Sequence, residues 1–317
     1  MKNPHFPDKL EGISPPFQIK KRKKLPPVSI IMATYNRKKV LEKTLKSLLN
    51  QDYPSPYEII VVDDCSTDGT REFLKEFAKK HRNLKIFLSK KNQGAAPSRN
   101  KAISMAKYPF CINMDDDCIA SKTWLKKMML PFTKEDNLGI VSAYAYYGGT
   151  STAFPTILLK KVGGYDTDYA PYSLREDTDL SFKIMDLGYK FKLIKAPYIH
   201  DHKEEEPKNI FDIIRYGIKR LKYHRNDVLL YKKHPTPLTE KFLRIKHGFL
   251  IDPFHDFSLA TGLWEGKFNL SSPRGIVFLE PKTPLHILVI YLIGFGYVLA
   301  VKFSRLLASL KYGKLLI

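Results

Sequence analysis

Three clusters of acidic residues could bind a cation or move a proton, and one of them is a run of three aspartates. Asp115, Asp116 and Asp117 directly follow the apolar residues 110–112. Adjacent carboxylates at a strand end repel one another, and a divalent cation or hydrogen-bond donors usually compensate that repulsion. Charged loops are common on protein surfaces, so the run by itself is only a candidate metal site.

The other two clusters have an ordinary structural explanation beside the chemical one. Asp63 and Asp64 precede residues 65–69, whose Ser, Thr and Asp side chains are favoured helix caps. Glu176 and Asp177 begin a segment with apolar residues at helical spacing, and the helix dipole favours carboxylates in a first turn. Both explanations are compatible with a role in chemistry.

The elements that must position these acids follow a regular alternation. From residue 28 onward, short β-rich runs alternate with longer segments whose apolar residues have helical spacing. This alternation predicts an α/β fold with a mainly parallel sheet flanked by helices, whose ligands bind beyond the carboxyl ends of the strands. Pro97 is expected to begin the third helix. The predicted strands are 28–35, 58–64, 84–89, 108–114, 139–147 and 190–194. The predicted helices include 40–49, 97–107, 176–187 and one that contains Phe73, Leu74 and Phe77.

Two C-terminal segments could contact a membrane. Residues 206–284 are basic and aromatic, and 215–223 predict an amphipathic helix that suits a membrane surface, nucleic acid or water about equally. Residues 285–301 are apolar except His286, close to the minimum of about 17 residues for a membrane span. Basic residues flank this stretch on both sides, so a re-entrant hairpin bent at 294–296, or an interfacial helix, fits better than a single span. A buried or dimer-forming helix is the alternative.

Composition limits the class of protein only loosely. The 317 residues carry a formal net charge of +21, which fits nucleic-acid binding, an anionic membrane surface or a Lys-rich exterior. Three cysteines without a CxxC pair indicate neither a disulfide framework nor a zinc knuckle and fit a reducing compartment.

Residues 1–27 lack an apolar stretch of signal-peptide length, so we expect the catalytic part on the cytoplasmic side. The basic residues 20–24 could touch anionic lipids or belong to a disordered tail.

Six motifs occur in the order found in the family 2 glycosyltransferases, which the chain resembles over residues 28–202. Residues 28–37 resemble the family's opening strand, 59–70 its second strand and nucleotide loop, and 92–100 its Asn-x-Gly and Arg-Asn element. Residues 115–117 match the DxD motif, 162–166 resemble the segment before the catalytic acidic pair, and 175–180 match that pair. The chain departs from the family pattern at Cys65, Cys118 and Lys183.

The resemblance implies a GT-A fold and a metal-dependent, inverting, hexosyltransferase-like enzyme. We expect residues 28–205 to form the catalytic domain, after a basic Pro/Lys-rich tail, 1–27. Residues 206–284 would be a basic amphipathic extension on the acceptor side, near the membrane, and 285–317 an apolar membrane-associating segment. The expected partners are a nucleotide-sugar donor, a glycan or lipid-linked acceptor and a membrane surface, without nucleic acid.

The resemblance also implies how the cation would be held. Asp117 would be a direct ligand of Mn²⁺ or Mg²⁺, and Asp115 a second ligand. Asp115 or Asp116 would hold the ribose or a metal-bound water. His200, followed by His202, would approach the metal or the diphosphate, and a pair of surface histidines is the alternative.

The remaining donor-site residues take their expected roles from the same resemblance. Asp64 would recognise the nucleotide base, Thr34 and Tyr35 would bind the nucleoside part, and Arg99 would meet the diphosphate with its planar donors. Core packing of Tyr35 and surface exposure of Arg99 are the alternatives.

By resemblance, the second acidic pair would perform the transfer. Asp177 would be the general base that accepts the proton of the acceptor hydroxyl, and Glu176 would orient the site or meet the acceptor. One displacement would invert the anomeric configuration. Acceptor contacts are expected from residues 170–174 and from the C-terminal region.

The expected activity serves glycan, polysaccharide or glycolipid synthesis at the cytoplasmic face of the cell membrane, with attachment through residues 285–317. A polyprenyl-phosphate sugar synthase, with a lipid phosphate as acceptor, is the first alternative. A basic nucleic-acid-binding protein, suggested by the net charge and by residues 215–225, is a weaker one, and its binding would fall steeply with salt.

Overall fold

The computed structural model describes residues 6–170, 174–201, 210–263, 266–271 and 277–317. The chain forms two compact units, each described here by itself. The N-terminal unit is Pro7–His202, and the C-terminal unit is Lys203–Ile317 together with Met1–Phe6.

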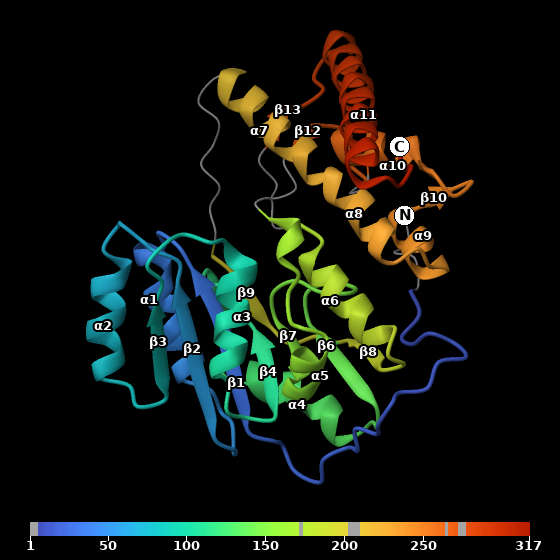
Figure 1. Ribbon diagram of the computed structural model, residues 1–317. Helices are drawn as coiled ribbons and strands as arrows, with labels where there is room; N and C mark the ends of the chain where they lie inside the picture. Colours follow the sequence, from blue (N-terminus) through green and yellow to red (C-terminus); the bar gives the residue numbers. More distant parts are fainter. Residues whose placement is uncertain (1–5, 171–173, 202–209, 264–265, 272–276) are drawn as a thin grey trace. The chain divides into compact units, whose positions relative to one another are not determined.

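A seven-stranded sheet forms the centre of the N-terminal unit (Figure 1). Its order is β3-β2-β1-β4-β7-β6-β8, and β7 alone runs antiparallel to its two neighbours, β4 and β6. The mainly parallel α/β sheet predicted from the alternation is therefore confirmed. The strands are β1 (Val28–Thr34), β2 (Tyr57–Asp63), β3 (Leu84–Leu88), β4 (Phe110–Asn113), β6 (Leu138–Ser142), β7 (Thr152–Pro155) and β8 (Lys190–Leu193).

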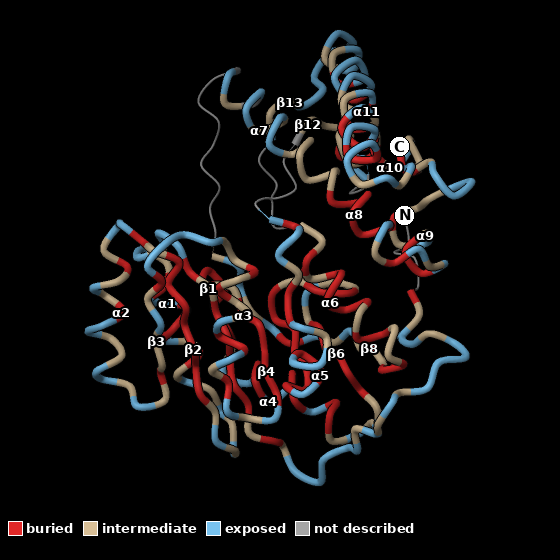
Figure 2. The backbone as a smooth tube through the Cα atoms, in the orientation of Figure 1, coloured by how far each residue is buried: buried red, intermediate tan, exposed pale blue. Residues whose placement is uncertain are grey.

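Helices cover the sheet, and its inner strands β1, β2, β4, β6 and β7 are buried almost throughout (Figure 2). Alternate residues of β1, namely Val28, Ile30 and Met32, belong to one apolar core with Leu41 and Leu45 of α1. Every second residue of the strand therefore packs against helix residues spaced about one turn apart, as the sequence pattern predicts. The helices are α1 (Lys38–Leu49), α2 (Thr70–Lys79), α3 (Ala95–Met105), α4 (Trp124–Met129), α5 (Thr156–Lys161) and α6 (Glu176–Met185), with 3₁₀ turns at Leu130–Thr133 and Thr167–Tyr169.

Two predicted boundaries in this unit are wrong. Helix α3 begins at Ala95, two residues before Pro97, because a proline is also tolerated within a first turn, where no intrahelical N–H bond is lost. The strand predicted over 139–147 ends at Ser142, and the chain turns back through Tyr147, which has a positive φ. The turn leads into β7, whose four residues carry too little pattern to be recognised.

A small two-stranded sheet lies outside the main one. Strand β5 (Cys118–Ala120) pairs antiparallel with β9 (Tyr198–His200), so that Cys118 is opposite His200. The backbone N–H of Asp201 also donates to the carbonyl of Asp117. These contacts fix the end of the unit against the segment that follows β4.

The segment before β1 is bound to the N-terminal unit through its backbone. Its carbonyl groups accept hydrogen bonds from residues close to β8 and β6, at Asp8 from the Phe191 amide, at Phe17 from the Tyr189 hydroxyl, and at Ile19 from the Asn137 amide. A disordered tail is therefore the wrong interpretation of residues 7–27.

The C-terminal unit consists of helices and two short hairpins. Its first helix, α7, contains the predicted amphipathic stretch and extends it toward the N-terminus. The helices are α7 (Ile210–Tyr223), α8 (Arg225–Lys233), α9 (Pro237–Leu243), α10 (Pro253–Ala260) and α11 (Pro284–Tyr312), and the hairpins pair β10 (Ile245–Lys246) with β11 (Leu250–Ile251) and β12 (Leu270–Ser271) with β13 (Val277–Leu279).

Helix α11 is one continuous helix, so the re-entrant hairpin expected near 294–296 is wrong. A Cβ atom at Gly294 would lie 2.6 Å from Thr261 Cγ2 and 2.8 Å from a ring carbon of Phe257, so this glycine allows α10 to approach closely. Among the described residues, α11 is the one helix long and apolar enough to cross a membrane, judged by length and composition.

A buried ionic cluster holds α11 against its neighbours in this unit. Arg305 on α11 is almost completely buried and contacts Asp256 Oδ2 at 2.6 Å and Asp227 Oδ2 at 3.1 Å. Lys302, one turn earlier, lies 3.3 Å from Asp256. Two cations thus face two carboxylates, and α8, α10 and α11 are joined by charge-assisted hydrogen bonds.

Candidate active site

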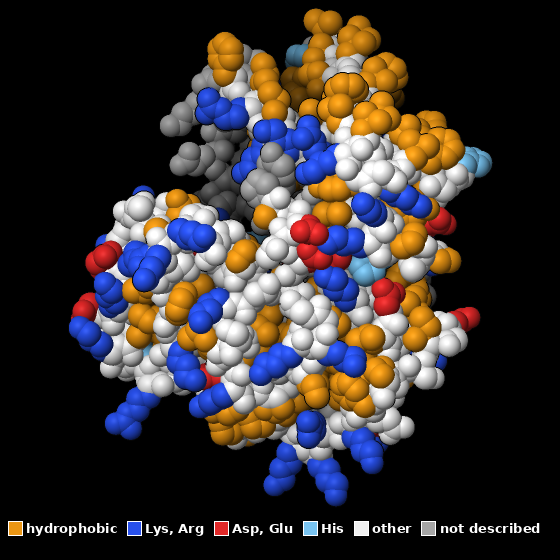
Figure 3. Space-filling view, viewed as in Figure 1, with side chains coloured by type: hydrophobic (Ala, Val, Ile, Leu, Met, Phe, Trp, Pro, Cys, Tyr) orange, Lys and Arg blue, Asp and Glu red, His pale blue; other side chains and the backbone are white. Residues whose placement is uncertain are grey.

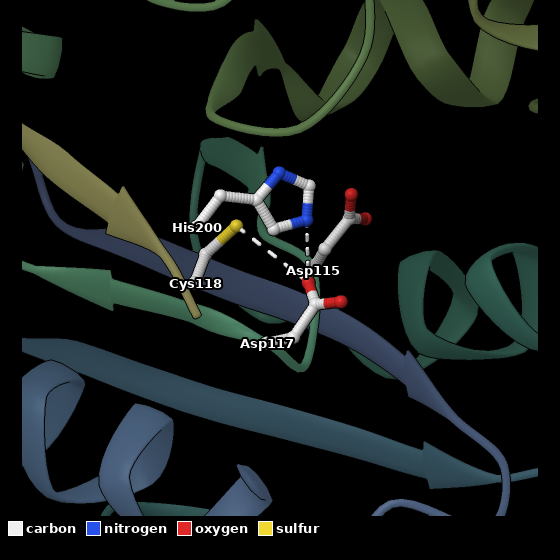
Figure 4. A group of neighbouring side chains, drawn as sticks. All are labelled: Asp115, Asp117, Cys118 and His200. Carbon is white, nitrogen blue, oxygen red and sulfur yellow. Dashed lines mark hydrogen bonds and ion pairs between the residues drawn. The ribbon is translucent and has the colours of Figure 1, made fainter. Parts of the chain in front are cut away.

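Four side chains with donor atoms converge beyond β4 (Figure 4). The ligand atoms of Asp115, Asp117, Cys118 and His200 all lie within 4.8 Å of one another. The Nε2 atom of His200 is 2.9 Å from Asp117 Oδ1, because the pairing of β5 with β9 places His200 beside the acidic run. The structure thus brings together the three residues predicted to hold the cation.

The chemistry of these donors suits a hard divalent cation. Two carboxylates and an imidazole match the preferences of Mn²⁺ and, less closely, of Mg²⁺. Burial raises the pKa of the Cys118 thiol to about 12, and a soft sulfur atom is a poor ligand for a hard divalent cation. Asp115, Asp117 and His200 therefore fit a cation that takes its other ligands from water or from a bound diphosphate.

Asp116 has a different environment from its two neighbours. Its carboxyl is buried, and burial raises its pKa to about 7, although the nearby Thr34 hydroxyl and the charge of Arg37 act in the opposite direction. Arg37 Nε lies 3.9 Å from Asp116, and Arg37 Nη2 lies 3.9 Å from Asp117. Asp116 faces β1 and Arg37, and it is not a member of the four-residue donor group.

Arg99 on α3 connects the donor group to the second acidic pair. Its guanidinium lies 3.2 Å from Asp115, 3.3 Å from Glu176 and 3.9 Å from Asp177, and its side chain is 12% exposed. Burial opposes the charge of Arg99, yet Asp177 and Asp115 hold its pKa above the ordinary value. The alternative of a surface arginine is therefore wrong, and the guanidinium also lies over the Tyr165 ring, 5.3 Å from its centroid.

The carboxylates of Glu176 and Asp177 are short of partners. Burial raises the pKa of both, and Asp177 raises that of Glu176 further, to about 7, against the opposing charge of Arg99. Within the described part of the chain, Glu176 Oε2 and Asp177 Oδ1 are buried without a hydrogen bond. Carboxyl groups with raised pKa at the edge of a cleft are typical of residues that exchange protons.

Two backbone features fix this pair. Arg175, the residue before α6, has a φ of 80°, a conformation that a non-glycine residue adopts only where the surroundings enforce it. Gly148 has a φ of 133°, and a Cβ atom there would lie 2.6 Å from Cβ of Asp177. The turn before β7 therefore packs directly on Asp177, and only glycine permits that approach.

Asp64 and Tyr35 lie at the ends of β2 and β1. The two oxygens of Asp64 accept hydrogen bonds from the backbone amides of Gln93 and Gly94, at 2.9 and 2.7 Å. The carboxylate therefore organises the loop before α3 whatever else it binds. Tyr35 is 46% exposed, so the alternative that it packs in the core is wrong. Thr34, by contrast, is buried beside Asp116.

A pocket of about 250 Å³ adjoins this loop. It is lined by residues 92–97 and by Tyr169, Ala170 and Glu176. The loop that Asp64 holds and the acid that Arg99 holds thus border the same cavity. Of the residues expected to meet an acceptor, 171–173 lie outside the described residues, as does His202.

Several contributors to the site were not singled out from the sequence. Arg37 lies in the first motif, but its contact with the acidic run depends on the turn after β1. Asn100 follows Arg99, and its side-chain amide donates to the Tyr165 carbonyl and accepts from the Tyr165 amide. This clamp fixes the ring that Arg99 lies over. The sequence motif identified the Arg-Asn dipeptide, but the contact of Asn100 with Tyr165 is visible only in the fold.

The arrangement of the sheet and the position of the site define a class of protein. The structure is similar to the mannosyltransferase PcManGT from Pyrobaculum calidifontis in complex with GDP-Man and Mn²⁺, with a TM-score of 0.56 and 19% identity over 93% of this chain and 90% of that one. At this identity the likeness shows the fold, which is that of the GT-A transferases.

Sequence comparison identifies the family. The model of the family described as glycosyl transferase family 2 matches residues 29–203, and the chain belongs to this family. Over 104 residues, 32% of this chain and 34% of the relative, it is 36% identical to glycosyltransferase AglE of Haloferax volcanii. It is 31% identical to the GalNAc(5)-diNAcBac-PP-undecaprenol beta-1,3-glucosyltransferase of Campylobacter jejuni over 160 residues, 50% of this chain and 47% of that one. The chain spans less than half the length of either relative.

Proposed function

We infer that the protein is an inverting, metal-dependent glycosyltransferase that moves a sugar from a UDP- or GDP-sugar to an acceptor hydroxyl. The proposal rests on one observation above all. A single guanidinium, that of Arg99, contacts both Asp115 of the cation-binding group and the Glu176–Asp177 pair. The groups that would hold the leaving diphosphate and the group that would accept a proton therefore belong to one site.

The residues of the chain suggest a division of labour. A divalent cation supplies charge stabilisation to the departing diphosphate, and Asp115, Asp117 and His200 would hold it. Arg99, with its planar donors, can turn from the carboxylates to an arriving diphosphate. Tyr35 is exposed enough to lie against the nucleoside, and Asp64 keeps two lone pairs for the base beside its two backbone hydrogen bonds.

Asp177 would act as the general base in the transfer. Its carboxyl has one buried oxygen, although the side chain as a whole is 25% exposed. Partial burial raises the pKa of Asp177, so this carboxylate accepts the proton of the acceptor hydroxyl more readily. Glu176 lines the pocket beside the 92–97 loop and would orient the acceptor or the sugar. One displacement at the anomeric carbon inverts its configuration and needs no covalent glycosyl-enzyme.

We place this activity at the cytoplasmic face of the membrane, in glycan, polysaccharide or glycolipid synthesis. The face of α11 directed away from α8 and α10 is apolar and exposed, and Lys and Arg side chains lie near it on the same unit (Figure 3). Such a face suits the interface of an anionic bilayer. Its exposed apolar residues are Leu285, Leu288, Leu292, Phe295, Leu299, Phe303 and Leu310.

A second candidate is transfer to a polyprenyl phosphate. It would use the same donor site and the same membrane face. The name of the Campylobacter relative describes a glycan joined to undecaprenol, which is the acceptor class of the first candidate and shares only the polyprenyl chain with the second. Incubation with donor and polyprenyl phosphate as sole acceptor separates the two candidates. A glycosyl phosphate product would support the second, whereas a product formed only with glycan-bearing lipid would support the first.

The deciding experiment measures release of nucleoside diphosphate from a panel of UDP- and GDP-sugars, with Mn²⁺ or EDTA and with solubilised membrane lipid as acceptor. We expect Mn²⁺-dependent turnover of one donor, lost in both Asp117→Ala and Asp177→Asn. Glu240→Gln, a change on α9 in the C-terminal unit, is the control and should keep wild-type turnover. If no donor turns over under any of these conditions, the transferase proposal fails.

A further inference from the structure

The C-terminal unit contains a pocket of its own, separate in sequence from the residues of the proposed transfer site. The pocket holds about 200 Å³ and is bordered by α7, α10, α11 and the β12–β13 hairpin. Most of its wall is apolar, formed by Leu259, Leu270, Phe278 and Ile293. A pocket with such walls accommodates a hydrocarbon chain rather than a sugar or a nucleotide, which require many hydrogen-bond partners.

The charges at this pocket leave one cation uncompensated. Asp256, which borders the pocket, already faces Arg305 and Lys302. His224 Nε2 lies 3.2 Å from the Tyr297 hydroxyl, and this uncharged hydroxyl also faces Arg220. Arg220 lines the pocket with its guanidinium over the Tyr216 ring, and none of the carboxylates in the described ranges forms an ion pair with it. The pocket is therefore apolar with one positive group.

The pocket is also continuous with the exposed apolar face of α11. Ile293 lines the pocket and is still 42% exposed, and its neighbours Leu292 and Phe295 are more exposed. On the other side, Gly217 lines the pocket and is followed by Ile218, which is half exposed. A chain could pass from a bilayer at this face into the pocket without crossing water.

We propose that this pocket binds a membrane lipid that consists of an alkyl or isoprenyl chain ending in a phosphate. The chain lies against Leu259, Leu270 and Phe278, and the phosphate is held by Arg220, whose planar donors suit a phosphate. The proposal assigns a lipid-binding role to the C-terminal unit and does not rest on the glycosyl transfer, because binding is measured without any donor.

The test uses the full chain in phosphatidylcholine nanodiscs and a photo-activatable dodecyl phosphate with a diazirine in its chain. We expect crosslinks at residues of α7, α10 and α11 that line the pocket, and competition by dodecyl phosphate. Dodecanol should compete much more weakly and inorganic phosphate not at all. Competition by inorganic phosphate equal to that by dodecyl phosphate would indicate a site for free phosphate and overturn the proposal.

Two variants with matched controls separate the pocket from general attraction to the bilayer. Arg220→Gln should weaken binding by roughly tenfold, because a charge-assisted hydrogen bond is lost, whereas Lys219→Gln on the exposed side of α7 should not. Equal loss in both variants would show bulk electrostatics instead of a site.

The second variant fills the pocket. A Cβ atom at Gly217 meets no atom within 4 Å, and glycine is unfavourable inside a helix, so Gly217→Leu should fold and occupy the space. Gly296→Leu adds the same side chain to α11, where the Cβ atom also meets nothing, and serves as control. We expect crosslinking to fall only in Gly217→Leu. Unchanged labelling in Gly217→Leu and Arg220→Gln would overturn the proposal even if donor turnover is normal.

Discussion

Each unit contains an arginine held among carboxylates, and the net charge of the two clusters differs. Arg305 shares its cluster with Lys302, and together they face Asp227 and Asp256, so the charges cancel. Arg99 alone faces Asp115, Glu176 and Asp177, which leaves an excess of negative charge when all three are ionised. The balanced cluster has only to hold helices together, whereas the unbalanced one is suited to receive a cation and a proton.

The largest effect is expected from removing the proposed base of the unbalanced cluster. Asp177→Asn keeps the shape of the side chain but cannot accept a proton, so turnover should fall by roughly 10²- to 10⁴-fold. Donor turnover measured as nucleoside-diphosphate release gives this value, and the unfolding transition should stay unchanged or rise. Retention of more than half of the wild-type turnover would exclude Asp177 as the base.

A substitution in the balanced Arg305 cluster should instead lower the stability of the fold. Arg305→Met leaves two buried carboxylates with one cation, and we expect the free energy of unfolding to fall by about 3–5 kcal/mol. Chemical unfolding in mild detergent, followed by circular dichroism, measures the change. The double variant Asp227→Asn with Arg305→Met should recover part of the loss, since Asp256 keeps Lys302. No recovery would mean that lost packing, not charge, causes the effect.

Neutralising one acid of the unbalanced cluster should stabilise the fold. The folded-state pKa of Glu176 lies above its ordinary value, so the folded protein holds this proton more tightly than the unfolded chain does. Stability is therefore lost as pH rises from about 4.5 to about 7. Glu176→Gln should raise the free energy of unfolding at pH 8 by roughly 1–3 kcal/mol and leave it unchanged at pH 4. An equal gain at both pH values would show that charge is not the cause.

The smallest predicted effect is a shift in the pH profile of turnover. Asp177 must be ionised to act as a base, and its raised pKa should make turnover increase with pH on the acid side. Because the two carboxyls titrate as a pair, Glu176→Gln removes a neighbouring titrating group and should move the acid limb to lower pH. A limb that stays in place in the variant would argue that another group controls it.

The sequence predicted the part of the molecule in which local pattern and global fold agree. Strands β1, β2 and β4 are buried apolar runs that end at the expected acids, and the order of the motifs placed Arg99, Asp115 and Glu176 in one region. The roles assigned to these residues remain predictions. Their spacing along the chain could be recognised because each motif is local and lies at the end of a regular element.

Contacts between short or irregular segments could not be predicted in the same way. Strands β5 and β9 have three residues each, too few for a periodic signal, although they determine which histidine reaches Asp117. The segment 7–27 binds through backbone carbonyls, which no side-chain pattern reveals. Gly294 suggested a bend from its residue type alone, and the packing of α10 against it is a tertiary feature.

The position of His200 has a consequence for biosynthesis. His200 lies on β9, the last strand of the N-terminal unit, whereas Asp115 and Asp117 lie directly after β4. During translation, the acids leave the ribosome well before the histidine does, and the pairing of β5 with β9 must wait for it. A nascent chain therefore completes its sheet core before it completes this donor set, and a cation bound as we propose would meet all three side chains only when the N-terminal unit is almost fully synthesised.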